Sequence, residues 1–373
     1  MNDYYKKHIE FTRTIINVSD IPDSELDGHC QDLLRAMPNA GKLYKYRSFK
    51  GKSFGFIYDS LKNGYLWIPP ANTLNDDFDS ILFDDSLAYL KGVVDDLCKD
   101  KDRFIFHTIK RNGEAKWRQN ENLKVIPFES FLECFDENSG ALIHERLIAL
   151  LSNAFEDNNQ QVQHLNLIGD FIKECIVLPE AKSFSTTAYN YNREICSKLH
   201  VFSMADSYNL DNMWGCYADS GEGFCIEYDF NKIYNLSNEQ KKMLLNTYMV
   251  EYVEKLNCLD IEAFVEMNFF NNKDLSIANR LFDSIIKQVT SKNKSWEHEN
   301  EWRIVLGNID SRLYADIVSG VIIDRRALNK TNAKKLIRLC QQKGWSIKVR
   351  YRSFFDGNHS FIDYDEYING LKD

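Results

Sequence analysis

The stretch from Ser295 to Leu306 constrains the fold more than any other part of the chain, because its polar and apolar residues alternate. Glu299, Glu301 and Arg303 fall on one face of a strand, since strand side chains point to opposite faces with a period of two. The pattern predicts a half-buried strand with two carboxylates and a guanidinium on its polar face, either as an active-site edge or as a surface salt bridge. The other face carries large apolar residues that can pack on a core: Trp302, Ile304 and Leu306.

Composition and charge narrow the class of protein. With 373 residues, of which 44% are hydrophobic and 27% charged, the chain can form one large domain or two of ordinary size. The formal net charge of −9 disfavours a dedicated nucleic-acid or anionic-membrane binder, because such proteins usually carry a basic surface. Only 6 prolines and 17 glycines argue against long flexible linkers.

Cysteine usage and the N-terminus bear on localisation. The nine cysteines are scattered without a Cys-x-x-Cys pair, which predicts reduced and mostly buried thiols. The first residues lack the apolar core of a signal peptide, and no apolar run approaches the length of a membrane span. These features predict a cytoplasmic protein with no membrane partner.

Helix and strand patterns do not alternate in a βαβ rhythm, which favours an α+β fold with a largely antiparallel sheet, continuous or split. Helices are expected at residues 21–37, 212–218, 261–270, 275–289 and 332–343, and a further helix is expected to end at Gly64. Strands are expected at residues 43–47, 65–68, 199–204, 224–228, 249–253, 299–306, 317–323 and 347–351.

The same patterns suggest a domain organisation. Residues 1–40 are expected to form an N-terminal helical segment, and residues 41–373 a single α+β domain. Between about residues 80 and 198 apolar side chains recur at spacings of three and four, which predicts a large helical insertion between two halves of the sheet.

Arg47 ends a predicted strand that also carries Tyr44. Its guanidinium could clamp a pyrophosphate bidentately, which lysine cannot imitate. The alternative is a structural ion pair with Glu301 or Asp79. The residue is therefore a candidate phosphate contact.

A polar loop follows the second predicted strand. Its carboxylates could bind Mg²⁺, or they could form turns and cap the next helix, and capping is the safer interpretation for at least one of them. The loop residues in question are Asn75, Asp76, Asp77 and Asp79.

Trp214 and Tyr217 lie three residues apart, on one side of a predicted helix. They could flank a planar ring in a ligand pocket, although a helical aromatic pair more often belongs to the core. Ser203 stands at a strand end where it could touch a ligand, and the absence of a Gly-x-Ser-x-Gly elbow excludes a serine hydrolase.

Several common sites are missing from the sequence. The histidines show no His-Glu-x-x-His spacing, and there is neither a Walker loop nor a Gly-x-Gly-x-x-Gly fingerprint. One scattered set of residues fits no standard zinc pattern and is better explained by buried thiols. That set is Cys196, His200, Cys216 and Cys225.

Five motifs in order resemble the uncharacterised bacterial "domain of unknown function 2971" family over about residues 43–350. Asp77 stands where that family usually has proline, and Cys216 where histidine is frequent. The resemblance implies no established activity. The motifs are Leu43–Arg47, Leu74–Asp79, Phe202–Ser203, Met213–Asp219 with Gly223–Tyr228, and Trp296–Arg303.

A looser similarity is to the ADP-ribosyltransferases, which place an arginine on the first strand, a serine on a middle strand and Glu-x-Glu before a late strand. It implies that Arg47 holds the phosphates of NAD⁺ and that Ser203 supports the nicotinamide ribose. Glu301 would stabilise an oxocarbenium-like transition state, and Glu299 would position or deprotonate the acceptor. The similarity requires Arg47 and Glu301 to face one cleft.

The same similarity implies further contacts to NAD⁺. Trp214 or Tyr217 would stack on nicotinamide, and Arg303 would orient the carboxylates. Tyr44, Asn75 and Asp79 complete the expected contacts to NAD⁺, which serves as the substrate, with no metal expected.

We therefore expect an NAD⁺-dependent ADP-ribosyltransferase or NAD⁺ glycohydrolase, with a protein or nucleic-acid acceptor. The resemblance suggests a bacterial toxin or an anti-phage effector with an antitoxin or regulatory partner. One alternative is a metal-dependent nuclease or phosphodiesterase with Mg²⁺ on Asp76, Asp79, Glu299 and Glu301. The other is a non-enzymatic sensor that binds a nucleotide or a protein.

Overall fold

The computed structural model divides into two compact units. Unit 1 comprises Met1–Ile81, Cys196–Leu256 and Ile286–Asp373, and unit 2 comprises Leu82–Ile195 and Asn257–Ile285. The residues that the structure describes are 3–13, 18, 20–73, 133, 143, 145–146, 149, 194–195, 197–260, 263, 274–307, 309–353 and 358–370.

The expected helical insertion falls almost wholly in unit 2 and almost wholly outside the described residues. Among the described residues of unit 2, the guanidinium of Arg280 pairs with the carboxylate of Asp260 at 3.0 Å. The backbone N–H of Asp260 donates to the hydroxyl of Ser284, also at 3.0 Å.

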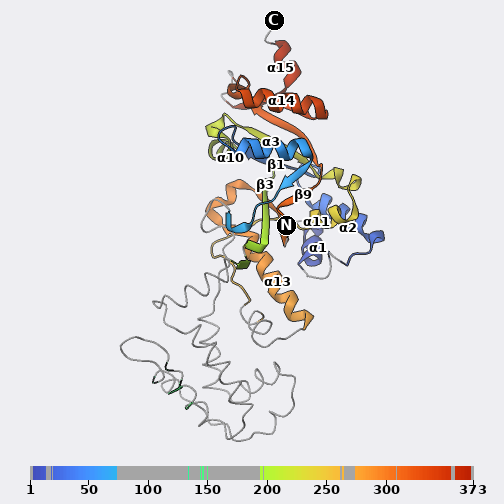
Figure 1. The fold of residues 1–373 in the computed structure, drawn as a ribbon, viewed down its shortest axis with the longest axis vertical. Helices are drawn as coiled ribbons and strands as arrows, with labels where there is room; N and C mark the ends of the chain where they lie inside the picture. Colours follow the sequence, from blue (N-terminus) through green and yellow to red (C-terminus); the bar gives the residue numbers. More distant parts are fainter. Residues whose placement is uncertain are drawn as a thin grey trace. The chain divides into compact units, whose positions relative to one another are not determined.

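Unit 1 is built on an eight-stranded sheet with the order β12-β11-β10-β4-β1-β3-β8-β5 (Figure 1). Neighbouring strands are antiparallel except for the parallel pair β10 and β11. The expected α+β fold with a largely antiparallel sheet is confirmed at this level. The strands are β1 Lys42–Arg47, β3 Leu199–Ala205, β4 Phe224–Asp229, β5 Thr247–Met249, β8 Glu301–Gly307, β10 Val318–Asp324, β11 Ser346–Arg352 and β12 His359–Asp363.

The two halves of the sheet meet between β1 and β3. Within the described residues, the only register pair between these strands joins Tyr44 to Ala205. By contrast, β3 pairs with β8 over its full length, from Leu199 to Ala205. The sheet is therefore weakly joined at β1 and β3, and the residues of β1 beyond Tyr44 diverge from β3.

Helices and short ribbons complete the fold. Two two-stranded ribbons pair β2 Tyr65–Trp67 with β9 Arg312–Tyr314, and β6 Glu251–Val253 with β7 Ser291–Asn293. The 3₁₀ turns are η1 Ala71–Thr73, η3 Asp219–Gly221, η4 Phe230–Asn235, η5 Lys294–Glu299 and η6 Arg325–Ala327. The α-helices are α1 Asp3–Thr12, α2 Asp23–Ala36, α3 Ser53–Asn63, α10 Asp211–Tyr217, α11 Asn238–Leu245, α13 Leu275–Val289, α14 Thr331–Lys343 and α15 Tyr364–Gly370.

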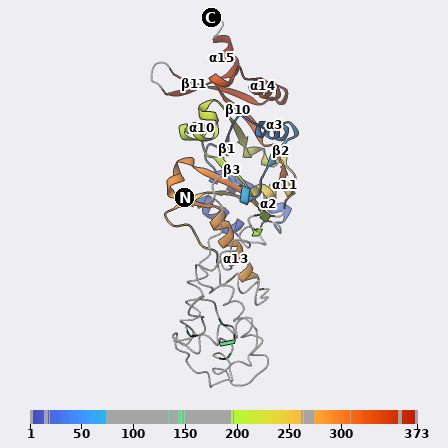
Figure 2. The ribbon, with the colours of Figure 1, turned by 60° about the vertical axis from the view of Figure 1, so that its left-hand side comes forward.

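The main core covers one face of the sheet. Leu43 of β1, Phe202 of β3 and Trp302 of β8 join it, together with residues of α2, α3, α11 and α14. The other face carries a smaller aromatic cluster in which Tyr46 and Ala205 pack against Trp214 of α10. Figure 2 shows α10 and α3 on opposite sides of β1. The period of two in the strands thus assigns each residue of β1 to one of two packed faces.

Local sequence signals mark the ends of two helices, of which α3 was expected and α11 was not. Gly64 follows α3 with φ of 69° and donates its N–H to the carbonyl of Ser60, because glycine adopts the left-handed region without strain. Ser237 and Gln240 form a reciprocal capping box at the start of α11. None of the helices formed by the described residues has the length and apolar character needed to span a membrane.

Candidate functional site

The carboxylate pair lies at the junction of η5 and β8. Glu299 is the last residue of η5, Asn300 has a left-handed φ of 46°, and Glu301 begins β8. The expectation that the strand starts at Glu299 is therefore wrong, because the left-handed turn at asparagine interrupts the alternation. Glu301 and Arg303 share one face, and Trp302 packs in the main core, as predicted.

Both carboxylates are buried, and each one is paired with a cation. Arg303 donates from Nε to Oε1 of Glu301 at 2.8 Å and from Nη2 to Oε2 at 3.1 Å. Lys292 Nζ lies 2.6 Å from Oε2 of Glu299 and 3.3 Å from Oε2 of Glu301. The hydroxyl of Tyr217 donates to Oε1 of Glu299 at 2.8 Å. We call these five residues the carboxylate cluster.

Backbone contacts fix the cluster to three neighbouring segments. Arg303, which is fully buried, donates from Nη1 to the carbonyl of Val289 at 2.6 Å. The backbone N–H of Glu301 donates to the hydroxyl of Tyr252 at 2.8 Å. Ser203, directly opposite Arg303 in the register, contributes a side-chain hydrogen bond to Glu301. The structure therefore brings Ser203 and Glu301 together.

Electrostatics keep Glu301 ionised. Burial acts to raise its pKa, but the charge and hydrogen bonds of Arg303, the charge of Lys292 and the hydrogen bond from Ser203 lower it to about 2. Burial and the neighbouring Glu299 raise the pKa of the Tyr217 hydroxyl above its ordinary value, so the hydroxyl remains a donor. The cluster holds two negative and two positive groups and is neutral as a whole.

Tyr44 lies on the same face as Glu301. Tyr44 pairs with Ala205, and Ala205 pairs with Glu301, so these residues form one row across β1, β3 and β8. Tyr44 also hydrogen-bonds to Glu227 of β4. Burial and, to a smaller extent, the charge of the Glu227 carboxylate raise the pKa of Tyr44. Glu227 accepts from Lys42 at 2.8 Å. The Tyr44 hydroxyl is thus bound within the sheet rather than free.

Arg47 lies on the opposite face. Its neighbour Tyr46 packs edge-on against Trp214, at 5.4 Å between ring centroids, so Arg47 points to the side of the main core. Burial lowers the pKa of Arg47, and Tyr228, a residue of that core, is the neighbour that opposes this change. The structure does not bring Arg47 and Glu301 to one face. Within the described part of the chain, the Arg47 side chain has no carboxylate partner.

Lys45 lies beside Arg47 on that face. Its ammonium donates to the carbonyl of Ser203 and lies 4.2 Å from the ring centre of Phe202. Burial lowers the pKa of Lys45 well below its usual range, the charges of Arg47 and Arg303 lower it further, and Glu301 opposes the change. Lys45 is thus within electrostatic reach of Arg47 and of the carboxylate cluster.

Trp214 belongs to the core. It is 1% exposed, its Nε1 donates to the carbonyl of Tyr208 at 2.9 Å, and the guanidinium of Arg350 lies 4.7 Å from its ring centre. Tyr217, one turn later, hydrogen-bonds to Glu299 instead of facing the same space. The two aromatic residues do not flank a common open pocket in the described residues.

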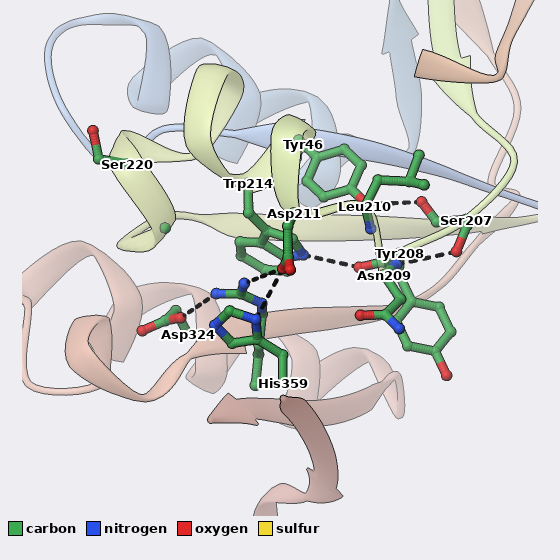
Figure 3. A network of polar contacts seen from close by, with 12 residues as sticks. Tyr46, Ser207, Tyr208, Asn209, Leu210, Asp211, Trp214, Ser220, Asp324 and His359 are labelled. Carbon is green, nitrogen blue, oxygen red and sulfur yellow. Dashed lines mark hydrogen bonds and ion pairs between the residues drawn. The ribbon is translucent and has the colours of Figure 1, made fainter. Parts of the chain in front are cut away.

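A second polar network anchors α10 (Figure 3). Buried Arg350 donates to Asp324 and to Asp211, both at 2.8 Å, and Asp211 also pairs with His359 at 2.9 Å. Asp211 is the first residue of α10, and Tyr217 is its last. The helix is therefore held at one end by strands β10 to β12 and at the other by the carboxylate cluster.

Some predicted site residues lie outside the described residues, and some residues of the observed cluster carry no local sequence signal. Lys292, Tyr252 and Arg350 were not singled out, because an isolated lysine, tyrosine or arginine has no motif that predicts its distant partner. Lys45 lies within the Leu43–Arg47 motif, although the sequence predicted no role for it. Outside the described residues lie Asn75, Asp76, Asp77 and Asp79.

The described residues contain no cluster suited to a metal ion. No group of three or more histidine, cysteine, aspartate or glutamate side chains there is arranged to hold a metal ion. Glu299 and Glu301 have Lys292 and Arg303 as their cationic partners.

Comparison with known proteins finds a family model that matches part of the chain. Residues 213–304 match the model of a protein of unknown function (DUF2971), and the matched segment contains every member of the carboxylate cluster. The resemblance predicted from the sequence is confirmed over this segment. No curated protein and no solved structure matches the chain.

Proposed function

We propose that this protein binds a phosphate-bearing nucleotide through Arg47 and Lys45. The observation that carries the proposal is that a half-buried guanidinium and a neighbouring ammonium lie together without a carboxylate partner in the described residues. Two such cations repel each other in a partly desolvated place, and a bound anion relieves that repulsion. Arginine matches phosphate oxygens with a planar pair of donors.

We further propose NAD⁺ as the nucleotide, with ADP-ribosyl transfer or NAD⁺ hydrolysis as the chemistry. Support comes from Ser203 and Glu301, which lie on the adjacent strands β3 and β8 and are hydrogen-bonded to each other. The carboxylate stays ionised at neutral pH, as stabilisation of an oxocarbenium-like centre requires.

The proposal makes two demands on the site. Lys292 lies closer to Glu299 than to Glu301, by 2.6 Å against 3.3 Å, so its contact with Glu301 is the one that a ribose hydroxyl would replace. The side chains of Arg47 and Glu301 lie on opposite faces of the eight-stranded sheet. One nucleotide could therefore contact both residues only where β1 and β3 diverge. Binding and chemistry therefore need separate measurements.

Binding is tested by calorimetry with NAD⁺ and ADP-ribose as probes. Arg47→Ala should weaken binding by about tenfold or more, because a charge-assisted phosphate contact is lost. The exposed Arg312→Gln is the matched control and should bind as the unsubstituted chain does. Failure of the unsubstituted chain to bind either probe overturns the proposal.

Chemistry is tested by following nicotinamide release, with bacterial lysate supplied as acceptor. Glu301→Gln should retain binding and lose release, and Ser203→Ala provides a second variant that leaves both ion pairs of the cluster in place. Thermal unfolding shows whether each variant is folded. Binding without release identifies a non-enzymatic nucleotide sensor, and nucleic-acid cleavage that a chelator abolishes identifies the metal-dependent alternative.

The biological role belongs to the same proposal. An enzyme that consumes NAD⁺ would act as a toxin or an anti-phage effector. Its expression in a bacterial host should lower the cellular NAD⁺ pool, and Glu301→Gln should not. An unchanged pool with arrested growth would assign the toxicity to another activity.

A further inference from the structure

The two edges of the eight-stranded sheet differ in how their backbone groups are satisfied. At one edge, side chains of α1 cover β5. The hydroxyl of Tyr5 donates to the carbonyl of Met249 at 3.1 Å and accepts from the N–H of the same residue at 2.7 Å. Nε2 of His8 lies 2.8 Å from the carbonyl of Thr247. These contacts occupy the groups that an edge strand otherwise offers to another chain.

The other edge is β12, which has β11 as its only strand neighbour among the described residues. The N–H of Ser353 donates to the carbonyl of Asn358 at 2.7 Å, and these two residues continue the register of the β11–β12 pair. Opposite residues of an antiparallel pair alternate between hydrogen-bonded and non-hydrogen-bonded positions. Within β12 the residues bonded to β11 are therefore Ser360 and Ile362.

The covered edge follows the same alternation. The N–H of Val250 donates to the carbonyl of Glu301 at 2.9 Å, in register with the β5–β8 pair. The alternation then directs the backbone groups of Thr247 and Met249 outward. These are the two residues that α1 binds, so the register rule correctly locates the open groups of an edge strand in this sheet.

Three residues of β12 direct their backbone N–H groups away from β11: His359, Phe361 and Asp363. The carbonyls of the first two also point outward, whereas Asp363 precedes α15 and gives its carbonyl to that helix. The helix contacts both β11 and β12, and its first residue, Tyr364, packs against the main core. It therefore lies over the core face of the sheet, and no described residue of unit 1 bonds the outward groups.

We propose that β12 pairs with β12 of a second copy of this chain, antiparallel and centred on Phe361, so that the two sheets become one. In this register Phe361 lies opposite itself, and Asp363 lies opposite His359 of the second copy. All three residues direct N–H groups outward, so hydrogen-bonding positions meet hydrogen-bonding positions. A shift by two residues would place His359 opposite Phe361 and leave Asp363 outside the pair.

Charge complementarity favours a second copy as the occupant. Nδ1 of His359 pairs with Asp211 at 2.9 Å (Figure 3), and no described residue bonds its Nε2. The Asp363 carboxylate is exposed and makes no ion pair within the described part of the chain. A histidine between two carboxylates carries a proton on both nitrogens and donates to each. The two-fold axis forms this contact twice.

The strand is ordered by its own chain before the copies meet. Phe361 packs edge-on against Tyr208, with ring centroids 4.7 Å apart. Because a short strand pair buries less area than a standard interface, we expect a weak dimer with a Kd of about 10–100 µM. The inference is independent of the proposed function, because none of these residues belongs to the carboxylate cluster or to the Arg47 site.

The test is sedimentation equilibrium of the full chain at up to about 200 µM and at about pH 6, below the ordinary pKa of histidine. The unsubstituted chain should dimerise. Asp363→Lys and His359→Glu should each weaken dimerisation by about tenfold or more, because each variant places like charges opposite one another at both contacts. An equimolar mixture of the two variants should associate again, because the new lysine then faces the new glutamate and Asp363 faces His359.

Asp365→Lys is the matched control, since Asp365 is exposed in the first turn of α15 and changes the net charge as Asp363→Lys does. It should leave dimerisation unchanged, and thermal unfolding shows whether each variant is folded. An equal loss in Asp365→Lys, or a mixture of folded variants that stays monomeric, would overturn the inference. A monomeric unsubstituted chain over the whole range would also overturn it and would leave the edge to a strand of a different protein.

Discussion

Removing the Arg303 guanidinium tests whether the carboxylate cluster stabilises the fold. Arg303→Met keeps much of the side-chain volume but deletes both hydrogen bonds to Glu301 and the one to the carbonyl of Val289. Glu301 then remains buried with its longer contact to Lys292 and the hydrogen bond from Ser203. Breaking a buried ion pair by removing one partner costs about 3–5 kcal/mol, so unfolding of unit 1 should become easier by that amount.

The lowered pKa of Glu301 gives a similar contribution to the free energy of unfolding. Its value of about 2, against 4.5 for the unperturbed group, corresponds to about 3 kcal/mol of stabilisation. Because the folded-state pKa is lowered, this stabilisation is fully present above pH 4.5 and is lost as the pH falls from 4.5 towards 2. In Arg303→Met the pKa of Glu301 rises, so this part of the acid sensitivity should shrink.

The assay is urea unfolding followed by tryptophan fluorescence between pH 7 and pH 3. Arg303→Met/Glu301→Gln should cost less than the sum of the single changes by about 1–3 kcal/mol, since it restores neutrality. Lys294→Met, which breaks an exposed pair with Glu254, is the control and should cost less than about 1 kcal/mol. Fluorescence reports mainly on unit 1, which holds five of the six tryptophans: Trp67, Trp214, Trp296, Trp302 and Trp345.

Two results would refute this reasoning. One is an Arg303→Met variant that unfolds within about 1 kcal/mol of the unsubstituted chain, because the pair would then contribute no more than an exposed one. The other is strict additivity of the Arg303 and Glu301 changes, because residues in one network must couple.

Four further substitutions test other parts of the structure. Gly223→Ala should abolish stable folding, because the new Cβ would overlap the Arg47 carbonyl and lie 2.7 Å from Cα of Ala218. Gly215→Ala is the control, because a Cβ there has nothing within 4 Å, and it should stabilise α10 by about 0.5–1 kcal/mol. Thermal unfolding of both variants measures these effects. Tyr217→Phe should cost about 1.5–3 kcal/mol in urea unfolding through loss of the hydrogen bond to Glu299, and an unchanged midpoint would argue against that bond. Lys45→Met should stabilise the ligand-free protein at neutral pH, because burial lowers the pKa of Lys45 in the folded state. The unfolded chain therefore binds the lysine proton more strongly than the folded chain does. As a result, the stability of the unsubstituted chain should rise as the pH increases from the folded-state pKa of Lys45 towards 10.5. An unchanged pH profile in Lys45→Met would contradict the assignment.

Strong local patterns predicted most elements of unit 1. The apolar run at residues 317–323 became β10, the helix expected at 332–343 became α14, and the strand expected at 43–47 became β1, each within about one residue. The short strands β7 and β9 and the C-terminal pair of β12 and α15 were missed. Three-residue strands carry too little periodicity to be recognised, and their existence depends on distant partners.

The candidate site was predicted only in part. The alternation of β8 identified Glu301 and Arg303 as neighbours on one face, and the serine on the adjacent strand proved to lie beside them. The partners of Glu299 could not be predicted, because Lys292 and Tyr217 come from β7 and α10 and meet it only in the folded chain. Arg47 was expected to face Glu301, and register placed it on the opposite face.

The sequence by itself determined the apolar faces of the strongly patterned strands and helices, the approximate bounds of those elements, and that Glu301 and Arg303 share one strand face. These properties follow from side-chain periodicity and from turn residues such as Gly64, which act over a few neighbours. Only the tertiary structure decided that the carboxylates are neutralised by Lys292 and Arg303, and that Arg47 and Lys45 have no carboxylate partner in the described residues. Charge pairing depends on which strands become neighbours, and strand order is set by packing over the whole sheet rather than by any local pattern.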